Sequence, residues 1–530
     1  MLNTPRSLGG MLVAPHHLAA QAGRDVLKEG GHAVDAMLAA AATIAVVYPH
    51  MNGIGGDGFW LIARAGQDPV AVDACGAAAL AATPEWYRER GVQQIPERGP
   101  LASLTVAGSI GGWQQARNVA ADWGPALPLS RLLADAIHHA RNGVATSRSQ
   151  AELSISKFDA LANVPGFAEQ FLDQGRPPAE GWVFRQPALA DTLEQLARAG
   201  LDDFYRGDLA RAQADDLAAV GSPLRLEDFA RHQSLVLPAL STRLNGATLF
   251  NQPPPTQGMA SLMILGMFER LGITEAEGFD HVHGLVEATK QAFIVRDAHC
   301  TDPAHMTVDV AEFLTAEAIR QRAGNIDRQR ALPWPHPGQP GDTIWMGCID
   351  QYGNAVSFIQ SIYWEFGSGV VLPQTGLLWQ NRGVSFSLDA DGAHPLQPGR
   401  KPFHTLNPAM ARFDDGRTMV YGTMGGEGQP QSQAALFSRY ALFNQPLQQA
   451  ITAPRWLLGR TWGDTTTTLK LESRFEPALV QALVDAGHNV EVLDAPFSDT
   501  MGHAGAIVRH ADGVLEGATD PRADGIVAAH

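Results

Sequence analysis

The chain has 530 residues, 45% of them apolar and 18% charged, a composition typical of soluble globular proteins. Its 55 acidic and 39 basic residues give a net charge of −16, which argues against nucleic acid or an anionic membrane as a partner. Three scattered cysteines, Cys75, Cys300 and Cys348, argue against a disulfide framework and a structural zinc site. No secretory signal is visible, and the longest apolar run, residues 36–48, is too short to span a bilayer, so we expect a cytoplasmic protein.

The first 330 residues are predicted to be mainly helical. Residues 17–47 are rich in alanine with apolar residues at helical spacing, and Gly30-Gly31 separates two predicted helices. A glycine-rich turn at 49–58 leads into a predicted strand at 59–63. Further helices are predicted over 129–142, 187–199, 259–271 and 280–300, with a rigid proline-rich loop at 251–258.

The pattern changes near residue 330. Residues 331–342 are dense in proline and glycine and cannot continue a helix. Short strand-like runs follow over 343–349, 355–362, 376–380, 409–413 and 418–422. The sequence therefore predicts an α/β protein that is mostly helical before this break and rich in sheet after it. Such a linker is usually an ordinary domain boundary, but this one ends at an unusual residue.

That residue is Thr343, which begins a predicted strand directly after Asp342. A threonine hydroxyl is a poor nucleophile unless a base lies beside it. The threonine's own α-amine, with a reference pKa of about 7.7–8.0, could act as the base if the peptide bond before it were cut. The hydroxyl can make that cut itself by attacking the preceding carbonyl. An Asp-Thr pair alone carries little weight, and its surroundings decide the interpretation.

Several motifs occur in a fixed order along the chain. Residues 342–356 read DTIWMGCIDQYGNAV, which is similar to the pattern DTTHxSVVDxxGNAV of the γ-glutamyltranspeptidase family. Residues 31–36 (GHAVDA) resemble its GGNAVDAA, residues 53–59 (GIGGDGF) its GIGGGGF, and residues 283–293, with Glu287 and Ala288, its LVEAxKxAF helix. Later segments at 398–402 (PGRKP) and 422–426 (GTMGG) continue the resemblance, which covers nearly the whole chain.

The resemblance implies a four-layer αββα sandwich of the N-terminal-nucleophile hydrolase type, with an added helical region in the first half. It also implies self-cleavage between Asp342 and Thr343, which would give a large subunit of residues 1–342 and a small subunit of 343–530 that share one fold. Thr343 would be the nucleophile, and Ser361 would replace the family's threonine that hydrogen-bonds it. Gly425 and Gly426 match the glycines whose backbone N–H groups form the oxyanion hole.

The departures from the family concern the substrate pocket. The family binds its substrate's α-carboxylate partly through an arginine, and Cys75 stands at that position here. The segment that holds its acidic anchor for the α-amino group reads QNRGVSF, so both acids are gone and Arg382 brings a positive charge. Tyr363 replaces an asparagine, and His404-Thr405 replaces a pair of serines. We therefore expect Arg382, Tyr363, His404 and Thr405 to line the pocket.

One nearby cation without an ammonium site fits a small amide that carries a carboxylate. Within the family, these departures most resemble a member that hydrolyses oxamate to oxalate and ammonia in the use of purine-derived nitrogen, which implies oxamate as the substrate. Alternatives are a γ-glutamyltransferase or glutathione hydrolase, a broader acylase of the same family, and a binding protein with an inactive site. No cofactor or metal is expected. The two subunits would form a heterodimer, with a dimer of heterodimers as a further option.

Two weaker signals suggest other kinds of binding site, but the residues around each argue against it. Gly53, Gly55 and Gly58 form a GxGxxG pattern, but the strand that follows them argues against a dinucleotide site, which needs a helix there. His281 and His283 with Glu287 could suggest a metal site. Residues two apart on a helix face different sides, so we expect a solvated or capped helix start instead.

Overall fold

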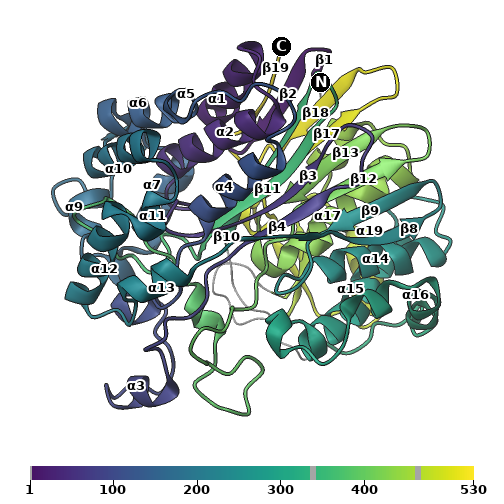
Figure 1. Ribbon diagram of the computed structural model, residues 1–530. Coiled ribbons are helices and arrows are strands. Elements are labelled where there is room, and N and C mark those ends of the chain that lie inside the picture. Colours follow the sequence, from purple (N-terminus) through teal and green to yellow (C-terminus); the bar gives the residue numbers. More distant parts are fainter. Residues whose placement is uncertain (1–2, 335–341, 460–466) are drawn as a thin grey trace.

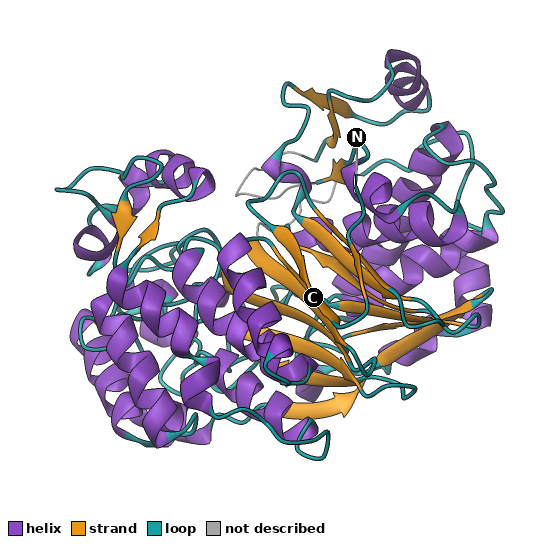
Figure 2. Ribbon diagram, turned by 90° about the horizontal axis from the view of Figure 1, so that it is seen from above, coloured by secondary structure: helices purple, strands orange, loops and turns teal. Residues whose placement is uncertain are grey.

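Two β-sheets lie face to face between two layers of helices, which gives a four-layer αββα arrangement (Figures 1 and 2). The structure is a computed structural model that describes residues 3–334, 342–459 and 467–530. Residues 335–341 of the predicted proline/glycine linker lie outside this range. The sandwich predicted from the sequence is confirmed.

Each large sheet has seven strands, and all neighbours within it are antiparallel. The order of the first sheet is β19 (Ile526–Ala529), β2 (Gly10–Ala14), β10 (Asp342–Asp350), β11 (Ala355–Tyr363), β3 (Asp57–Ala63), β4 (Val70–Ala74) and β7 (Leu235–Pro238). The order of the second is β1 (Arg6–Ser7), β18 (Leu515–Thr519), β17 (Ala504–Arg509), β13 (Thr418–Thr423), β12 (Ala409–Phe413), β9 (Ala247–Asn251) and β8 (Leu240–Leu244).

Helices α1 (His17–Lys28), α2 (Ala33–Val47) and α4 (Ser109–Val119) cover the first sheet. Beyond α2 lies the added helical region that the sequence predicted: α5 (Leu129–Leu132), α6 (Ala134–Asn142), α7 (Arg148–Ser156), α8 (Phe158–Leu161), α9 (Phe167–Phe171), α10 (Pro187–Ala199), α11 (Asp203–Arg206), α12 (Asp208–Val220) and α13 (Leu226–Arg231). The second sheet is covered by α14 (Gly258–Arg270), α17 (Gln429–Phe437) and α18 (Leu447–Thr452), and α15 (Phe279–His299) and α16 (Ala316–Ala323) pack against α14 in the same helix layer. Within the described ranges, no helix combines the length and apolarity needed to cross a bilayer.

Smaller elements complete the chain. A three-stranded sheet of β14 (Trp456–Leu458), β15 (Leu469–Glu472) and β16 (Val490–Leu493) lies with α19 (Pro477–Asp485) beside the second helix layer. The short α3 (Pro84–Arg88) lies at the periphery of the molecule in Figure 1. The hairpin of β5 (Val144–Ala145) and β6 (Val183–Phe184) lies at the periphery in Figure 2.

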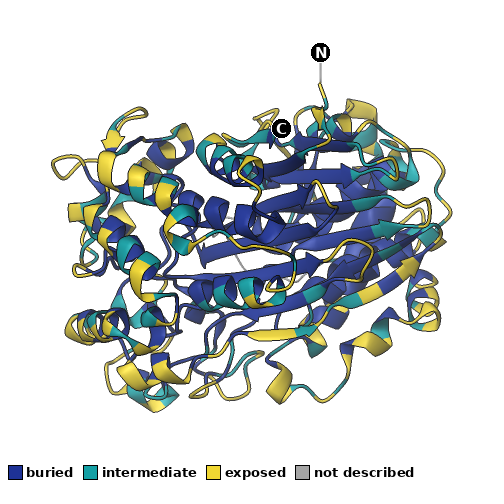
Figure 3. Cartoon of the chain, turned by 45° about the horizontal axis from the view of Figure 1, so that its top comes forward, coloured by how far each residue is buried: buried dark blue, intermediate teal, exposed yellow. Residues whose placement is uncertain are grey.

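The inner strands of the sheets, such as β3 and β11, are buried on both faces, whereas the edge strands β7 and β8 are partly exposed (Figure 3). In β10, Met346 and Cys348 pack against the helices of the first layer, whereas Trp345 and Ile349 pack between the sheets. This two-sided burial follows from the alternation of side chains along a strand. It explains why the sequence of β10 is almost continuously apolar.

Both halves of the chain contribute strands to both sheets. β10 and β11, from the second half, lie between β2 and β3, from the first. Residues 3–334 and the described residues after 341 therefore belong to the same two sheets. The prediction that the first half is mostly helical is confirmed, because its strands are short and separated by long helical stretches.

Two local predictions were wrong. Residues 376–380 form no strand, because Trp379 and Gln380 donate their backbone hydrogen bonds to the loop residues Val370 and Gly55. The helix predicted over 129–142 is interrupted at Leu133, so α5 and α6 are separate. The other predicted helices and strands are present, with ends shifted by two residues or fewer.

The contact between the two sheets can be tested at Gly422. A Cβ atom added there would lie 2.2 Å from Cδ1 of Trp345, a rigid ring that is itself buried. We expect Gly422→Ala to lower the free energy of unfolding by about 1–3 kcal/mol, the usual cost of overpacking. Denaturant unfolding in an uncleaved Thr343→Ala background measures it. Gly278→Ala, where no atom lies within 4 Å of the added carbon, is the control and should change stability little.

Candidate functional site

Thr343 lies at the start of the central strand β10 and is completely buried. The pairing of β10 with β11 shifts register between Asp342 and Ile344, where Thr343 lies opposite two residues of β11, an irregularity of the β-bulge kind with the extra residue on β11. Bulges redirect side chains and are common beside active sites. The Oγ1 atom of Thr343 donates a hydrogen bond to Oγ of Ser361 at 3.3 Å, and Ser361 Oγ also accepts the backbone N–H of Tyr363 at 2.8 Å.

The second sheet brings Gly425 and Gly426 to the same end of the sandwich. Trp345 of β10 contacts Gly422 of β13, while Gly347 faces Val420, so the two strands run in opposite directions across the interface. When this antiparallel alignment of β10 and β13 is continued toward the start of β10, the loop after β13 lies beside Thr343. Gly425 has φ 117° and Gly426 φ 53°, backbone conformations that favour glycine. Neither backbone N–H donates a hydrogen bond within the described ranges.

A buried glutamine supports this loop. The side-chain amide of Gln257 donates hydrogen bonds to the backbone carbonyls of Gly426 (2.9 Å) and Thr405 (2.8 Å). Its own oxygen accepts a hydrogen bond from Arg296 at 2.9 Å. Gln257 therefore holds together two loops that the sequence analysis assigned to different parts of the site.

Arg382 is 1% exposed and lies in a short 3₁₀ turn after β11. Its guanidinium carbon lies 3.7 Å from the centre of the Tyr363 ring, so the tyrosine forms a cation–π platform. Nε and Nη1 have no hydrogen-bond partner among the described residues. Burial lowers the pKa of Arg382 to about 10, which leaves it charged at neutral pH. A buried cation with free donors is suited to an anionic group.

Tyr363 has φ 82°, a conformation that is rare for a residue with a bulky side chain. Asparagine tolerates it far better, and asparagine is the residue that the family pattern has at this position. In this backbone conformation the tyrosine ring lies against the guanidinium of Arg382. Backbone strain of this kind is concentrated at functional sites.

His404 and Thr405 are buried beside this cation. Neither ring nitrogen of His404 nor Oγ1 of Thr405 has a hydrogen-bond partner within the described ranges. Burial lowers the pKa of His404 well below its ordinary value, so the ring is neutral. Its Nε2 atom lies 3.2 Å from Oδ2 of Asp57, without the alignment of a hydrogen bond.

Asp57 was missed by the sequence analysis. It begins β3 and pairs directly with Ser361 of β11. The signal was available, because aspartate interrupts a run of glycines in the family motif. Those glycines serve packing: a Cβ atom on Gly55 or Gly56 would lie 2.2 or 2.0 Å from a backbone oxygen of another segment. This agrees with the prediction that the GxGxxG pattern is not a phosphate loop.

Cys75 lies close to Asp57 and Arg382. Its thiol is buried, and burial raises its pKa well above the ordinary value, so it offers no charge. A cavity of about 210 Å³ is lined by Cys75, Val106, His232 and Lys401, among others. Lys401 is not a free cation, because its Nζ atom is 2.6 Å from Oδ2 of Asp73.

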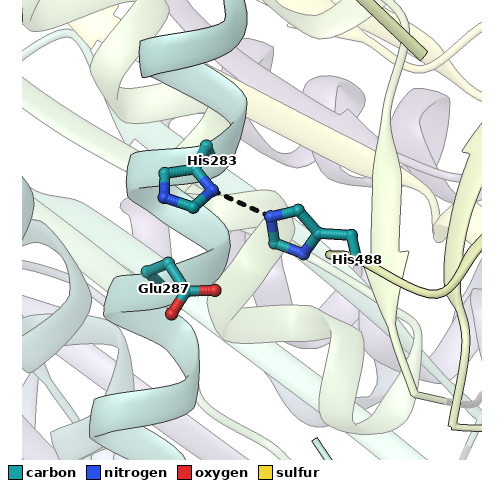
Figure 4. Close-up of side chains that lie close together, drawn as sticks. All are labelled: His283, Glu287 and His488. Atoms are coloured by element: carbon teal, nitrogen blue, oxygen red, sulfur yellow. Dashed lines mark hydrogen bonds between the residues drawn. The ribbon is translucent and has the colours of Figure 1, made fainter. Parts of the chain in front are cut away.

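His283, Glu287 and His488 lie close together away from this site (Figure 4). The expectation of a solvated helix start was wrong, since both His281 and His283 are buried, but the start is capped, because Nδ1 of His281 accepts the backbone N–H of Glu277 at 3.0 Å. Nδ1 of His283 is hydrogen-bonded to His488 at 2.8 Å, and Lys290 lies 2.6 Å from the carboxylate of Glu287. An ammonium on the carboxylate opposes a metal ion there, and we interpret the group as a hydrogen-bond network.

This network anchors the segment that leads to the linker. Glu287 accepts the backbone N–H of Leu332 at 3.0 Å, and Lys290 donates to the Leu332 carbonyl at 2.7 Å. His283 is hydrogen-bonded through Nε2 to the Asp327 carbonyl at 2.8 Å. The glutamate and lysine of the LVEAxKxAF motif therefore have a structural explanation.

Comparison with known proteins agrees with this geometry. The family model for gamma-glutamyltranspeptidase matches residues 19–530. The chain is 56% identical to the oxamate amidohydrolase proenzyme of Klebsiella pneumoniae, over 99% of both chains. It is 40% identical to the glutathione hydrolase-like YwrD proenzyme of Bacillus subtilis, over 97% of both.

Among solved structures, the cephalosporin acylase of Bacillus halodurans superposes with a TM-score of 0.91 at 33% identity, covering 100% of this chain and 97% of that one. This agreement spans both sheets and both helix layers, and it confirms the fold class predicted from the sequence. The chain therefore belongs to the gamma-glutamyltranspeptidase family.

Proposed function

We propose that this protein is a self-cleaving N-terminal-threonine amidohydrolase that converts oxamate to oxalate and ammonia. The observation that carries the proposal is the buried Arg382, whose free donors lie beside the end of the strand that holds Ser361 and Tyr363. The 56% identity to a proenzyme named for oxamate supports the substrate. The lower identities to a glutathione hydrolase-like proenzyme and to an acylase keep those activities as alternatives to be tested.

Activation begins with Thr343. Its hydroxyl attacks the carbonyl carbon of Asp342, the peptide bond breaks, and the acyl group moves from nitrogen to oxygen. This shift frees the α-amine of Thr343, and water then hydrolyses the resulting ester, which frees the α-carboxylate of Asp342 and the Thr343 hydroxyl. The products are a large subunit of residues 1–342 and a small subunit of 343–530.

Turnover uses the same hydroxyl on an external amide. The new α-amine accepts the hydroxyl proton while Oγ1 attacks the amide carbonyl. The negative charge that develops on the carbonyl oxygen is stabilised by the backbone N–H groups of Gly425 and Gly426. Ammonia leaves with the transferred proton, and water hydrolyses the acyl-enzyme to release the acid. Ser361, hydrogen-bonded to Oγ1, orients the nucleophile.

Substrate selection follows from charge and size. Arg382 binds the carboxylate by paired hydrogen bonds, for which a guanidinium is better shaped than an ammonium. Tyr363 supports the arginine through the face of its ring, and the side chains of His404 and Thr405 limit the size of the pocket. A γ-glutamyl group would require a second, ammonium-binding site some distance from the first.

The proposal includes the setting of the enzyme. The two subunits stay together as a heterodimer, with a dimer of heterodimers as a further option, in the cytoplasm. The reaction would serve the use of purine-derived nitrogen. The proenzyme names of the two relatives support processing of a single precursor.

Self-cleavage predicts a specific product. Fresh purified protein should give two bands on a denaturing gel, and N-terminal sequencing of the smaller should begin at Thr343. Thr343→Ala should remain one chain, because it lacks the attacking hydroxyl. A wild-type protein that is active while still full-length would rule this mechanism out.

The oxyanion role of Gly425 and Gly426 predicts the effect of Gln257→Glu. The carboxylate cannot donate to the two carbonyls, so the loop should move away from its catalytic position. Leaving one buried partner unbound costs about 1–3 kcal/mol, so kcat should fall by about 5-fold to 150-fold with little change in KM. Gln213→Glu is the matched control, since Gln213 also donates to two carbonyls, those of Phe204 and Leu209. It should leave kcat unchanged, and an equal loss in both variants would contradict the assignment.

The carboxylate role of Arg382 predicts the effect of Arg382→Met. Loss of a charge-assisted contact in a desolvated site costs roughly 2–5 kcal/mol. We expect kcat/KM for oxamate to fall by about 30-fold to several thousand-fold, with self-cleavage retained. Arg382→Lys should fall between, because it keeps the charge and loses the planar fork. Ammonia release from oxamate and hydrolysis of a γ-glutamyl anilide are measured side by side. Efficient turnover of the anilide with none of oxamate would overturn the substrate.

A further inference from the structure

The two oxygens of the Asp57 carboxylate have different surroundings. Oδ1 accepts hydrogen bonds from the backbone N–H groups of Gly76 and Gly108, both at 3.0 Å, and from the side-chain amide of Gln380 at 3.2 Å. Oδ2 has no hydrogen-bond partner among the described residues. One oxygen therefore fixes the position of the side chain, and the other is available.

The available oxygen belongs to a group of buried polar atoms that do not satisfy one another. Oδ2 of Asp57, both ring nitrogens of His404, and Nε and Nη1 of Arg382 all lack partners within the described part of the chain. A buried polar atom without a partner destabilises the folded protein. Several such atoms at one place indicate a site that is completed by a ligand.

The charges of this group depend on whether an anion is bound. With the site empty, the carboxylate of Asp57 balances the buried guanidinium of Arg382. A substrate carboxylate on Arg382 would put two anions beside one cation in a region of low dielectric constant. Protonation of Asp57 removes this repulsion and leaves its Oδ1 hydrogen bonds possible.

We propose that the site binds its carboxylate substrate together with one proton, which Asp57 takes up, so that Asp57 is a positioning residue that links substrate affinity to pH. The inference rests on the proposed function, because it requires an anionic substrate on Arg382. The proton comes from solvent on binding and returns to it when the product acid leaves, so none is consumed.

Asp57 is the group in this cluster whose titration falls near neutral pH. Burial raises its pKa to about 6. Burial lowers the pKa of His404 and of His232, the latter to about 4, and raises that of Cys75 and of Tyr205, so these four stay neutral. The other charged groups that face the cluster are Arg382 and the ion pair of Lys401 with Asp73.

The sign of the pH effect follows. Above its pKa Asp57 is ionised and repels the incoming anion, so affinity falls as pH rises. Between the pKa of the empty site and the higher pKa of the occupied site, the dissociation constant should rise about tenfold per pH unit. A neutral residue of the same shape should abolish the dependence and bind more tightly at high pH.

Oxalate binding to the mature enzyme tests this, because oxalate is not turned over and keeps its charge above pH 6. Calorimetric titration between pH 6.5 and 8 should show wild-type affinity falling about tenfold per unit over part of this range. Asp57→Asn, which keeps an Oδ1 acceptor, should show a flat profile and tighter binding than wild type at pH 8. Asp228→Asn is the control: Asp228 is also a buried carboxylate that accepts two backbone N–H groups, and its variant should follow wild type.

A second measurement needs no variant. Titrating wild type with oxalate in two buffers of different ionisation enthalpy counts the protons bound, and we expect up to one per anion. No proton uptake, or the same pH profile in Asp57→Asn as in wild type, would overturn the inference and leave the proposed function intact. A mature protein that binds neither oxalate nor oxamate would overturn the proposed function as well.

Discussion

The site depends on the burial of β10 in the middle of a sheet. Neighbouring strands hold this strand on both edges, and a helix layer and a second sheet hold its two faces. A nucleophile on a loop would have to lose conformational freedom when it reacts, whereas Thr343 is already fixed. The register shift at Thr343 is a local irregularity in an otherwise regular strand pair, of a kind that is common beside active sites.

Around this fixed point the protein tolerates unfavourable features. A non-glycine residue holds a positive φ angle at Tyr363, and buried polar atoms of Arg382 and His404 lack partners in the described structure. Each costs stability, and none is needed for the αββα sandwich to form. Their concentration beside Ser361 is what separates a functional site from the surrounding core.

Much of this could be predicted from the sequence, and the limits have physical causes. Thr343 and the residues near it in the chain follow from ordered motifs, and the two-sided burial of β10 agrees with its apolar sequence. The run at 376–380 has strand-like residues but no neighbouring strand, which no local pattern reveals. Asp57 was overlooked because its segment matches the family's glycine motif as a whole, and its contact with His404 joins residues that are far apart in the chain. Gln257 likewise acts through carbonyls on two other loops.

The interleaved strands have a consequence for a molecule that has been cut before Thr343. Each sheet would then contain strands of two separate polypeptides, with β10 and β11 enclosed between β2 and β3. Separation of the pieces would require breaking the sheets, so dissociation and unfolding become the same event. Refolding, which is unimolecular for the precursor, would become a bimolecular search by two incomplete chains. The working life of such an enzyme is governed by how slowly it opens, because a molecule that has opened once is not expected to recover.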